Sequence, residues 1–203
     1  MRIQRGDVLL TSMVGGKDSN WRDRALSSMI ISHQKKQMKG FVPTRSHAEL
    51  ITSSGGETFA ARWKTDFRPE GLKDYIGSNI TIGRAEALTQ EVFDKAWKSA
   101  NLDSQVGRIY PVHRLALQGI STWIFPWITN IGMGIWLICS EVVSKLLHHA
   151  YKIVGPDVFE QFAGQWQGNT PAHLEQVIKD SDDWVEVFNG ELTPKLYNEF
   201  TGR

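Results

Sequence analysis

Residues 135–147 read IWLICSEVVSKLL, and this stretch decides how we expect the chain to fold. An uncharged apolar run ends at Cys139, and beyond it apolar residues recur at intervals of three and four. These residues are Val142, Val143, Leu146, Leu147 and Ala150. The spacing predicts an amphipathic helix over residues 140–153, which Gly155 and Pro156 would end. The only cysteine of the chain therefore falls at the beginning of a helix that needs an apolar surface to pack on.

The rest of the sequence predicts several short strands, which can form a sheet on which this helix packs. Apolar and alternating runs predict strands at residues 8–10, 48–51, 58–63, 79–83 and 184–188. The second and third form an antiparallel hairpin, because Ser53-Ser54-Gly55-Gly56 lies between them. Helical spacing adds helices at residues 21–38, 88–101 and 171–179, the second of them capped near Thr89. The prediction is an α+β fold, and the absence of repeats and low-complexity linkers favours a single domain over residues 1–203.

Composition narrows the classes of function. With 203 residues and 41% hydrophobic residues, the chain can bury one ordinary core. Its 23 Lys and Arg residues nearly balance 22 Asp and Glu residues, and a net charge of +1 is too small to draw the chain to nucleic acid, which we exclude as a partner. A single cysteine can form neither an internal disulfide nor a cysteine-rich metal site.

Two segments bear on location. The beginning of the chain is charged where a signal peptide would be apolar, so we expect a cytoplasmic protein, with release by lysis or non-classical export as the open alternative. Residues 115–140 carry no charge, but glycines and polar residues interrupt them, which argues against a transmembrane helix. The stretch can form core, line a substrate site, or touch lipid peripherally through Trp123, Phe125 and Trp127.

Cys139 is the first candidate for chemistry. Backbone N–H groups at a helix N-terminus favour a thiolate, which is the nucleophilic form of cysteine, and can hold the oxyanion of an acyl-transfer reaction. The alternative is that Cys139 is simply a small buried residue, as free cysteines often are.

His47 is the candidate base. It opens a predicted strand in which alternation places His47, Glu49 and Ile51 on one face, and histidine is the side chain whose pKa suits proton transfer near neutral pH. A structural histidine at a strand end is the alternative. His148 and His149 are adjacent on a helix and point in different directions, so we expect neither a metal site nor a cofactor.

Three segments occur in an order that is informative. They are Arg5-Gly6-Asp7-Val8-Leu9-Leu10, Ser46-His47-Ala48-Glu49-Leu50 and Cys139-Ser140-Glu141-Val142-Val143. Together they resemble the YiiX/YebB-like family, a circularly permuted branch of the NlpC-type papain-like hydrolases in which the histidine strand precedes the cysteine helix. The resemblance also takes in residues 107–110 and 170–174.

The resemblance implies a circularly permuted papain-like fold, with an antiparallel sheet packed against the helix that carries the nucleophile. It also implies a Cys139–His47 pair and a third polar residue that orients the imidazole. Family members tend to carry that residue on the partner strand, where this chain has Ala60. We rank Glu49 first for this role because it shares a face with His47, and Thr58 second because it shares strand parity with Ala60. A backbone carbonyl that orients the ring is the remaining alternative.

The function that follows is a cysteine peptidase or amidase, which cleaves an amide of the cell-wall peptide type through a thioester. Two alternatives stay open. One is a lipid or acyl thioesterase or acyltransferase that uses the tryptophan-rich stretch, as lecithin-retinol acyltransferases in the wider group act on acyl chains. The other is an inactive binding or structural module, which the alanine at position 60 suggests. The substrate is a peptide or an acyl compound, and the sequence does not define an oligomeric state.

Overall fold

The computed structural model describes residues 2–12, 27–28, 30–32, 34–36, 38, 40–61, 67–106, 139–155, 158–164 and 169–203. The described residues between 27 and 36 are helical, as part of the predicted helix over residues 21–38. Several predictions concern residues outside the described set: the family segment at 107–110, most of the apolar stretch, and Trp123, Phe125 and Trp127.

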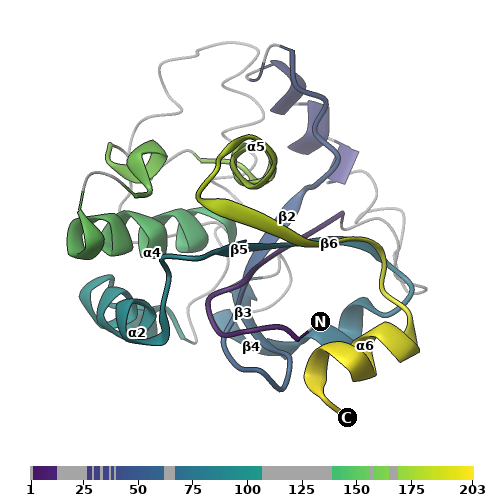
Figure 1. Cartoon of the computed structure of the whole chain (residues 1–203). Helices are drawn as coiled ribbons and strands as arrows, with labels where there is room; N and C mark the ends of the chain where they lie inside the picture. Colours follow the sequence, from purple (N-terminus) through teal and green to yellow (C-terminus); the bar gives the residue numbers. More distant parts are fainter. Residues whose placement is uncertain are drawn as a thin grey trace.

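A six-stranded antiparallel sheet forms the centre of the molecule (Figure 1). Its strands are β1 (Val8–Thr11), β2 (His47–Ile51), β3 (Glu57–Ala61), β4 (Phe67–Gly71), β5 (Asn79–Ala85) and β6 (Trp184–Glu191). They lie in the order β4-β3-β2-β1-β5-β6, so β1 and β2 are central and β4 and β6 are edges. In the central pair, Thr11 lies opposite His47 and Leu9 opposite Glu49.

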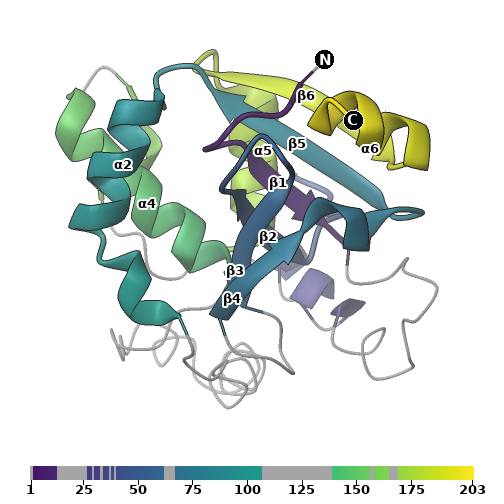
Figure 2. The same cartoon turned by 90° about the horizontal axis from the view of Figure 1, so that it is seen from below.

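Helices cover both faces of the sheet (Figure 2). Besides the helical residues between 27 and 36, the α-helices of the described part are α2 (Gln90–Ser99), α4 (Cys139–Val154), α5 (Pro171–Asp180) and α6 (Pro194–Thr201). Its 3-10 helices are η1 (Leu72–Tyr75), η2 (Leu102–Gln105) and η4 (Glu160–Phe162). Buried residues of α2, α4 and α5 pack with Ala48 and Leu50 of β2 on one face. Residues of η1 and α6 pack with Ile51 on the other face. The helix that begins at Cys139 is therefore packed against the strand that begins at His47.

Local signals explain where the helices begin. The Thr89 side chain accepts a 3.3 Å hydrogen bond from the Val92 N–H at the start of α2. At α5, Thr170 forms a capping box with His173, and Pro171 occupies the first turn. The described residues contain no helix that is both long and apolar enough to cross a bilayer.

The predicted α+β class and the predicted strands and helices among the described residues are confirmed, with shifts of one to three residues at their ends. The prediction omitted β4, α6 and the three 3-10 helices.

Candidate functional site

His47 is the first residue of β2 and is buried. Its Nε2 lies 2.9 Å from Oε1 of Glu49, two residues further along the same strand. The pair forms because side chains at i and i+2 of a strand project from the same face. The contact occupies Nε2, which leaves Nδ1 as the ring nitrogen available to Cys139.

Glu49 is a carboxylate with no exposed surface, and its polar neighbours are His47, Tyr75 and Thr58. The Tyr75 O–H donates a hydrogen bond to Oε1, the same oxygen that His47 contacts. Burial on its own would raise the pKa of Glu49, but the hydrogen bond and charge of His47, with contributions from Thr58 and Tyr75, lower it below its usual value. Glu49 is therefore ionised at neutral pH.

Cys139 opens α4 and is 5% exposed. Burial favours the neutral thiol, yet the charge of His47 and a hydrogen bond to its ring, joined by the backbone N–H groups of Ala48 and Ser140, lower the thiol pKa. The Ser140 N–H belongs to the first turn of the helix, as the sequence led us to expect.

The Ala48 N–H reaches the sulfur because β3 has stopped pairing with β2 at that point. The β2–β3 register covers only Leu50 and Ile51, whereas β2 pairs with β1 as far as His47. Alternate residues of a strand direct their N–H groups to opposite neighbours, and Ile51 donates to Asp7 on the β1 side. Ala48 therefore donates on the opposite side, where the sulfur stands in for a strand carbonyl.

His47 responds to the same neighbours. Burial alone would lower its pKa, but the Cys139 thiolate, through its charge and a hydrogen bond, and the Glu49 carboxylate together raise the pKa to about 10. A raised imidazole pKa and a lowered thiol pKa describe one state, a buried thiolate–imidazolium pair with a carboxylate behind the imidazolium.

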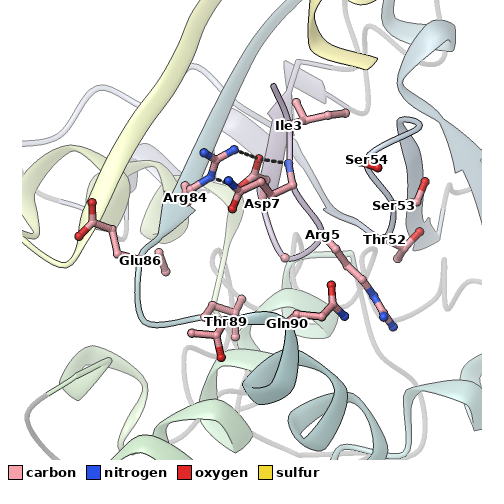
Figure 3. A pocket seen from close by; sticks show the side chains of 14 residues that line it. Ile3, Arg5, Asp7, Thr52, Ser53, Ser54, Arg84, Glu86, Thr89 and Gln90 are labelled. Atoms are coloured by element: carbon pink, nitrogen blue, oxygen red, sulfur yellow. Dashed lines mark hydrogen bonds and ion pairs between the residues drawn. The ribbon is translucent and has the colours of Figure 1, made fainter. Parts of the chain in front are cut away.

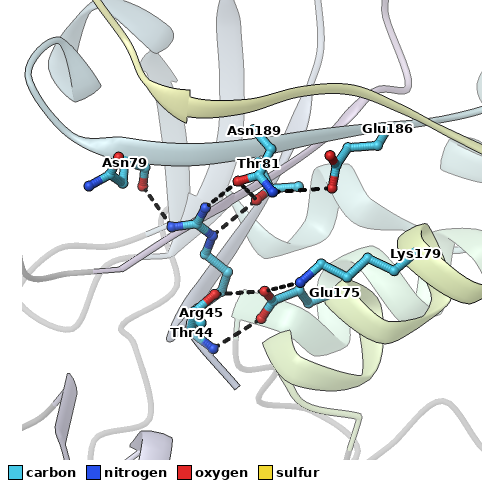
Figure 4. A network of polar contacts seen from close by, with 8 residues as sticks. All are labelled: Thr44, Arg45, Asn79, Thr81, Glu175, Lys179, Glu186 and Asn189. Carbon is cyan, nitrogen blue, oxygen red and sulfur yellow. Dashed lines mark hydrogen bonds and ion pairs between the residues drawn. The ribbon is translucent and has the colours of Figure 1, made fainter. Parts of the chain in front are cut away.

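The residues that lead into His47 are anchored to three other elements (Figure 4). The Arg45 guanidinium is buried and donates to Thr81 Oγ1 at 3.0 Å, to the Asn79 carbonyl at 3.1 Å and to Asn189 Oδ1 at 2.9 Å. Thr44 donates from its N–H and its hydroxyl to the buried Glu175 carboxylate of α5, at 3.1 and 2.6 Å.

Ser46 completes the anchoring, because its N–H donates to the Thr11 carbonyl at 3.0 Å and its Oγ lies 2.8 Å from Ser27 Oγ. Next to Cys139, Ser140 Oγ donates to the Asn169 carbonyl at 2.7 Å. Both sides of the Cys139–His47 contact are thus fixed by hydrogen bonds to other parts of the chain.

The structure brings together all four residues that the sequence proposed for the site. Cys139 contacts His47, and Glu49 rather than Thr58 contacts the imidazole. Thr58 is buried on β3 and acts on the Glu49 carboxylate from beyond close hydrogen-bond distance. Tyr75 was not predicted, and no spacing or motif in the sequence marks it.

The other described histidines have hydrogen-bond partners away from Cys139. His148 Nδ1 lies 2.7 Å from the Phe162 carbonyl, His149 Nδ1 lies 2.8 Å from Ser99 Oγ, and His173 takes part in the cap of α5. Within the described part of the chain, no three His, Cys, Asp or Glu side chains are arranged to hold a metal ion.

A pocket of about 600 Å³ lies at the other end of β1 from His47 (Figure 3). Residues 3–7, 52–54, 84–86 and 88–90 line it. Asp7 and Arg84 form an ion pair in its wall, with contacts of 2.8 and 2.7 Å. None of Cys139, His47 and Glu49 lines this pocket, and its opposite charges balance, so we do not assign the chemistry to it.

Comparison with known proteins gives matches among solved structures alone. No protein-family model and no curated protein matches the chain. Among solved structures, the crystal structure of metalloprotein yiiX from Escherichia coli O157:H7 matches with a TM-score of 0.45 and 12% sequence identity, over 98% of this chain and 94% of that one. A similarity this low assigns neither a family nor a function to the chain.

Proposed function

We propose that the chain is a cysteine hydrolase with a circularly permuted papain-like fold, in which Cys139 is the nucleophile, His47 the base and Glu49 the residue that orients the imidazole. The observation that carries the proposal is a pair of buried contacts: Cys139 contacts His47, and His47 contacts Glu49. Two further observations support the fold: the histidine strand precedes the cysteine helix in the chain, and the helix packs on that strand.

The reaction is acyl transfer through a thioester. The Cys139 thiolate attacks the carbonyl carbon of the substrate, and backbone N–H groups near Cys139 stabilise the resulting oxyanion. The C–N bond then breaks, and the His47 imidazolium gives its proton to the departing amine. Neutral His47 next takes a proton from water, the hydroxide attacks the thioester carbonyl, and the thiolate is restored as the acid leaves.

For the substrate, we propose an amide of the peptide type, such as a bacterial cell-wall peptide, because the family resemblance points to it. The uncharged stretch at residues 115–140 favours a lipid or acyl ester as the second candidate. Liposome binding that disappears in Trp123→Ser/Trp127→Ser would support the second candidate. An inactive module was suggested by Ala60, and the contact of Glu49 with His47 argues against it.

The test is the pH dependence of Cys139 alkylation by iodoacetamide, which reads the thiolate without knowledge of the substrate. We expect an apparent thiol pKa well below the ordinary value of about 8.5 in the native protein. In His47→Ala the pKa should return to that value or exceed it, and the rate at pH 6 to 7 should fall roughly 10- to 100-fold, because the partner charge is gone.

His149→Ala is the matched control, since this histidine contacts α2 rather than Cys139. Its alkylation profile should equal that of the native protein. A native thiol that is inert throughout, or that titrates like a free cysteine, would overturn the proposal and leave a binding or structural role.

A further inference from the structure

We infer that Tyr75 is a positioning residue of this site, which holds the Glu49 carboxylate in the orientation and ionisation state that His47 requires. The inference rests on the proposed function, because it concerns how the same site is organised. It adds a fourth residue to Cys139, His47 and Glu49, from an element that the sequence did not connect with them.

The geometry places two donors on one oxygen. Tyr75 ends η1, is 7% exposed, and donates its O–H to Glu49 Oε1, which is also 2.9 Å from His47 Nε2. A carboxylate with one donor can rotate about its side-chain torsions. A second donor on the same oxygen, the Tyr75 hydroxyl from η1, restricts that rotation and keeps Oε1 toward the imidazole.

The chemical type of the donor matters as well. Glu49 lies on the sheet face that packs Ile51, Leu72 and Ile80, where a carboxylate without donors would take up a proton. A lysine or arginine in place of Tyr75 would keep Glu49 ionised but would cancel its charge toward His47. A neutral phenol donates a hydrogen bond and leaves the negative charge for the imidazolium.

The backbone around Tyr75 is fixed by three hydrogen bonds. The Leu72 N–H donates to the Gly56 carbonyl at 2.7 Å, the Ser78 N–H donates to the Tyr75 carbonyl at 2.9 Å, and the Gly77 N–H donates to the Leu192 carbonyl at 2.8 Å. The first joins η1 to the β2–β3 hairpin and the last joins it to the end of β6. Tyr75 is thus held to the same sheet that carries His47 and Glu49.

The test is the alkylation profile of Tyr75→Phe, which removes only the hydroxyl. The titratable groups facing Glu49 are His47 and Tyr75, with Cys139 beyond the imidazole. Loss of one hydrogen-bond donor should raise the pKa of Glu49. The Glu49 carboxylate then stabilises protonated His47 less, so the apparent thiol pKa of Cys139 should rise. We expect roughly a three- to tenfold lower alkylation rate at pH 6 to 7. Tyr197→Phe, on α6, is the matched control and should leave the profile unchanged.

A double-mutant cycle separates this role from simple packing. If Tyr75 acts through Glu49, then Tyr75→Phe should add nothing to the change caused by Glu49→Gln. Independent, additive changes would overturn the inference, and so would a Tyr75→Phe profile equal to that of the native protein. A native protein without a His47-dependent thiol pKa would instead overturn the proposed function itself.

A second measurement needs no Tyr75 variant and applies if Tyr75→Phe fails to fold. The buried hydroxyl proton of Tyr75 should give a downfield NMR signal in the native protein, and the signal should move upfield in Glu49→Gln as the acceptor loses its charge. A signal that is indifferent to Glu49→Gln would overturn the inference.

Discussion

Two buried carboxylates, one just before β1 and one on the neighbouring strand β2, have partners of different kinds. Asp7 precedes β1 and binds the Arg84 guanidinium through both oxygens, at 2.8 and 2.7 Å, while also accepting the Gln4 N–H at 2.8 Å. Glu49 on β2 binds an imidazole and a phenol. Both carboxylates are at most 1% exposed, so burial does not distinguish them.

The difference lies in what the partner can do. A guanidinium stays charged at every accessible pH, so Arg84 cannot take part in proton transfer, and its ion pair with Asp7 joins β1 to β5. An imidazole can lose its proton, so the Glu49–His47 pair has two states, and Cys139 decides between them. A buried carboxylate therefore suggests chemistry only when its partner can titrate.

The largest expected effect comes from breaking the ion pair of Asp7 and Arg84. Arg84→Met leaves the Asp7 carboxylate buried without its cation, which should lower the free energy of unfolding by roughly 3 kcal/mol. Urea denaturation at pH 7 measures this, with the exposed Lys98→Met as control. The Cys139 alkylation profile should stay native, and a changed profile would mean that the two carboxylates are not independent.

The next effect comes from removing the charge of the other carboxylate. Glu49→Gln keeps the shape of the side chain but cannot favour an imidazolium, so the pKa of His47 should fall from about 10 and the apparent thiol pKa should rise. We expect roughly a tenfold lower alkylation rate at pH 6 to 7, with a smaller loss of stability than Arg84→Met causes.

Thr58→Val is the matched variant for this comparison, because Thr58 faces the same carboxylate at longer range. Its profile should change by less than that of Glu49→Gln. The opposite ranking would make Thr58 the orienting residue, our second choice from the sequence.

The smallest effect concerns a third carboxylate, Glu175. Lys179 is 37% exposed and lies 2.9 Å from it, one helical turn away. Because Lys179 is half-exposed and the buried Glu175 keeps its two hydrogen bonds from Thr44, Lys179→Met should change the free energy of unfolding by less than about 1 kcal/mol and leave alkylation unchanged. A clear loss of Cys139 reactivity would instead show that this pair helps to anchor the segment before His47.

Much of the fold could be predicted because its signals are local. The alternation in β2, the cap at Thr89 and the Thr170-Pro171 start of α5 each lie within a few residues of the element they define. The edge strand β4 was missed because Pro69 breaks any strand pattern, and proline is tolerated where a strand pairs on one side only. Helix α6 has Thr193 and Pro194 at its start, the same signal that marks α5, and could have been found.

The site divides in the same way. Glu49 was predicted because it lies two residues from His47 on one strand. Tyr75 lies 26 residues beyond Glu49 on a 3-10 turn, and only the folding of η1 over the sheet brings the two together. The hydrogen bond from the Ala48 N–H to Cys139 could not be predicted either. It depends on where β3 stops pairing with β2, which the sequence does not define.

Because β3 does not pair with β2 at Ala48, the backbone amide of Ala48 reports on the Cys139 sulfur. In most sheets the exchange of an amide proton with deuterium measures how often the strands open. The Ala48 amide is held by the Cys139 sulfur, so its exchange measures the charge on that atom. Alkylation of the sulfur should release this amide to solvent while the neighbouring amide of Leu50 stays protected.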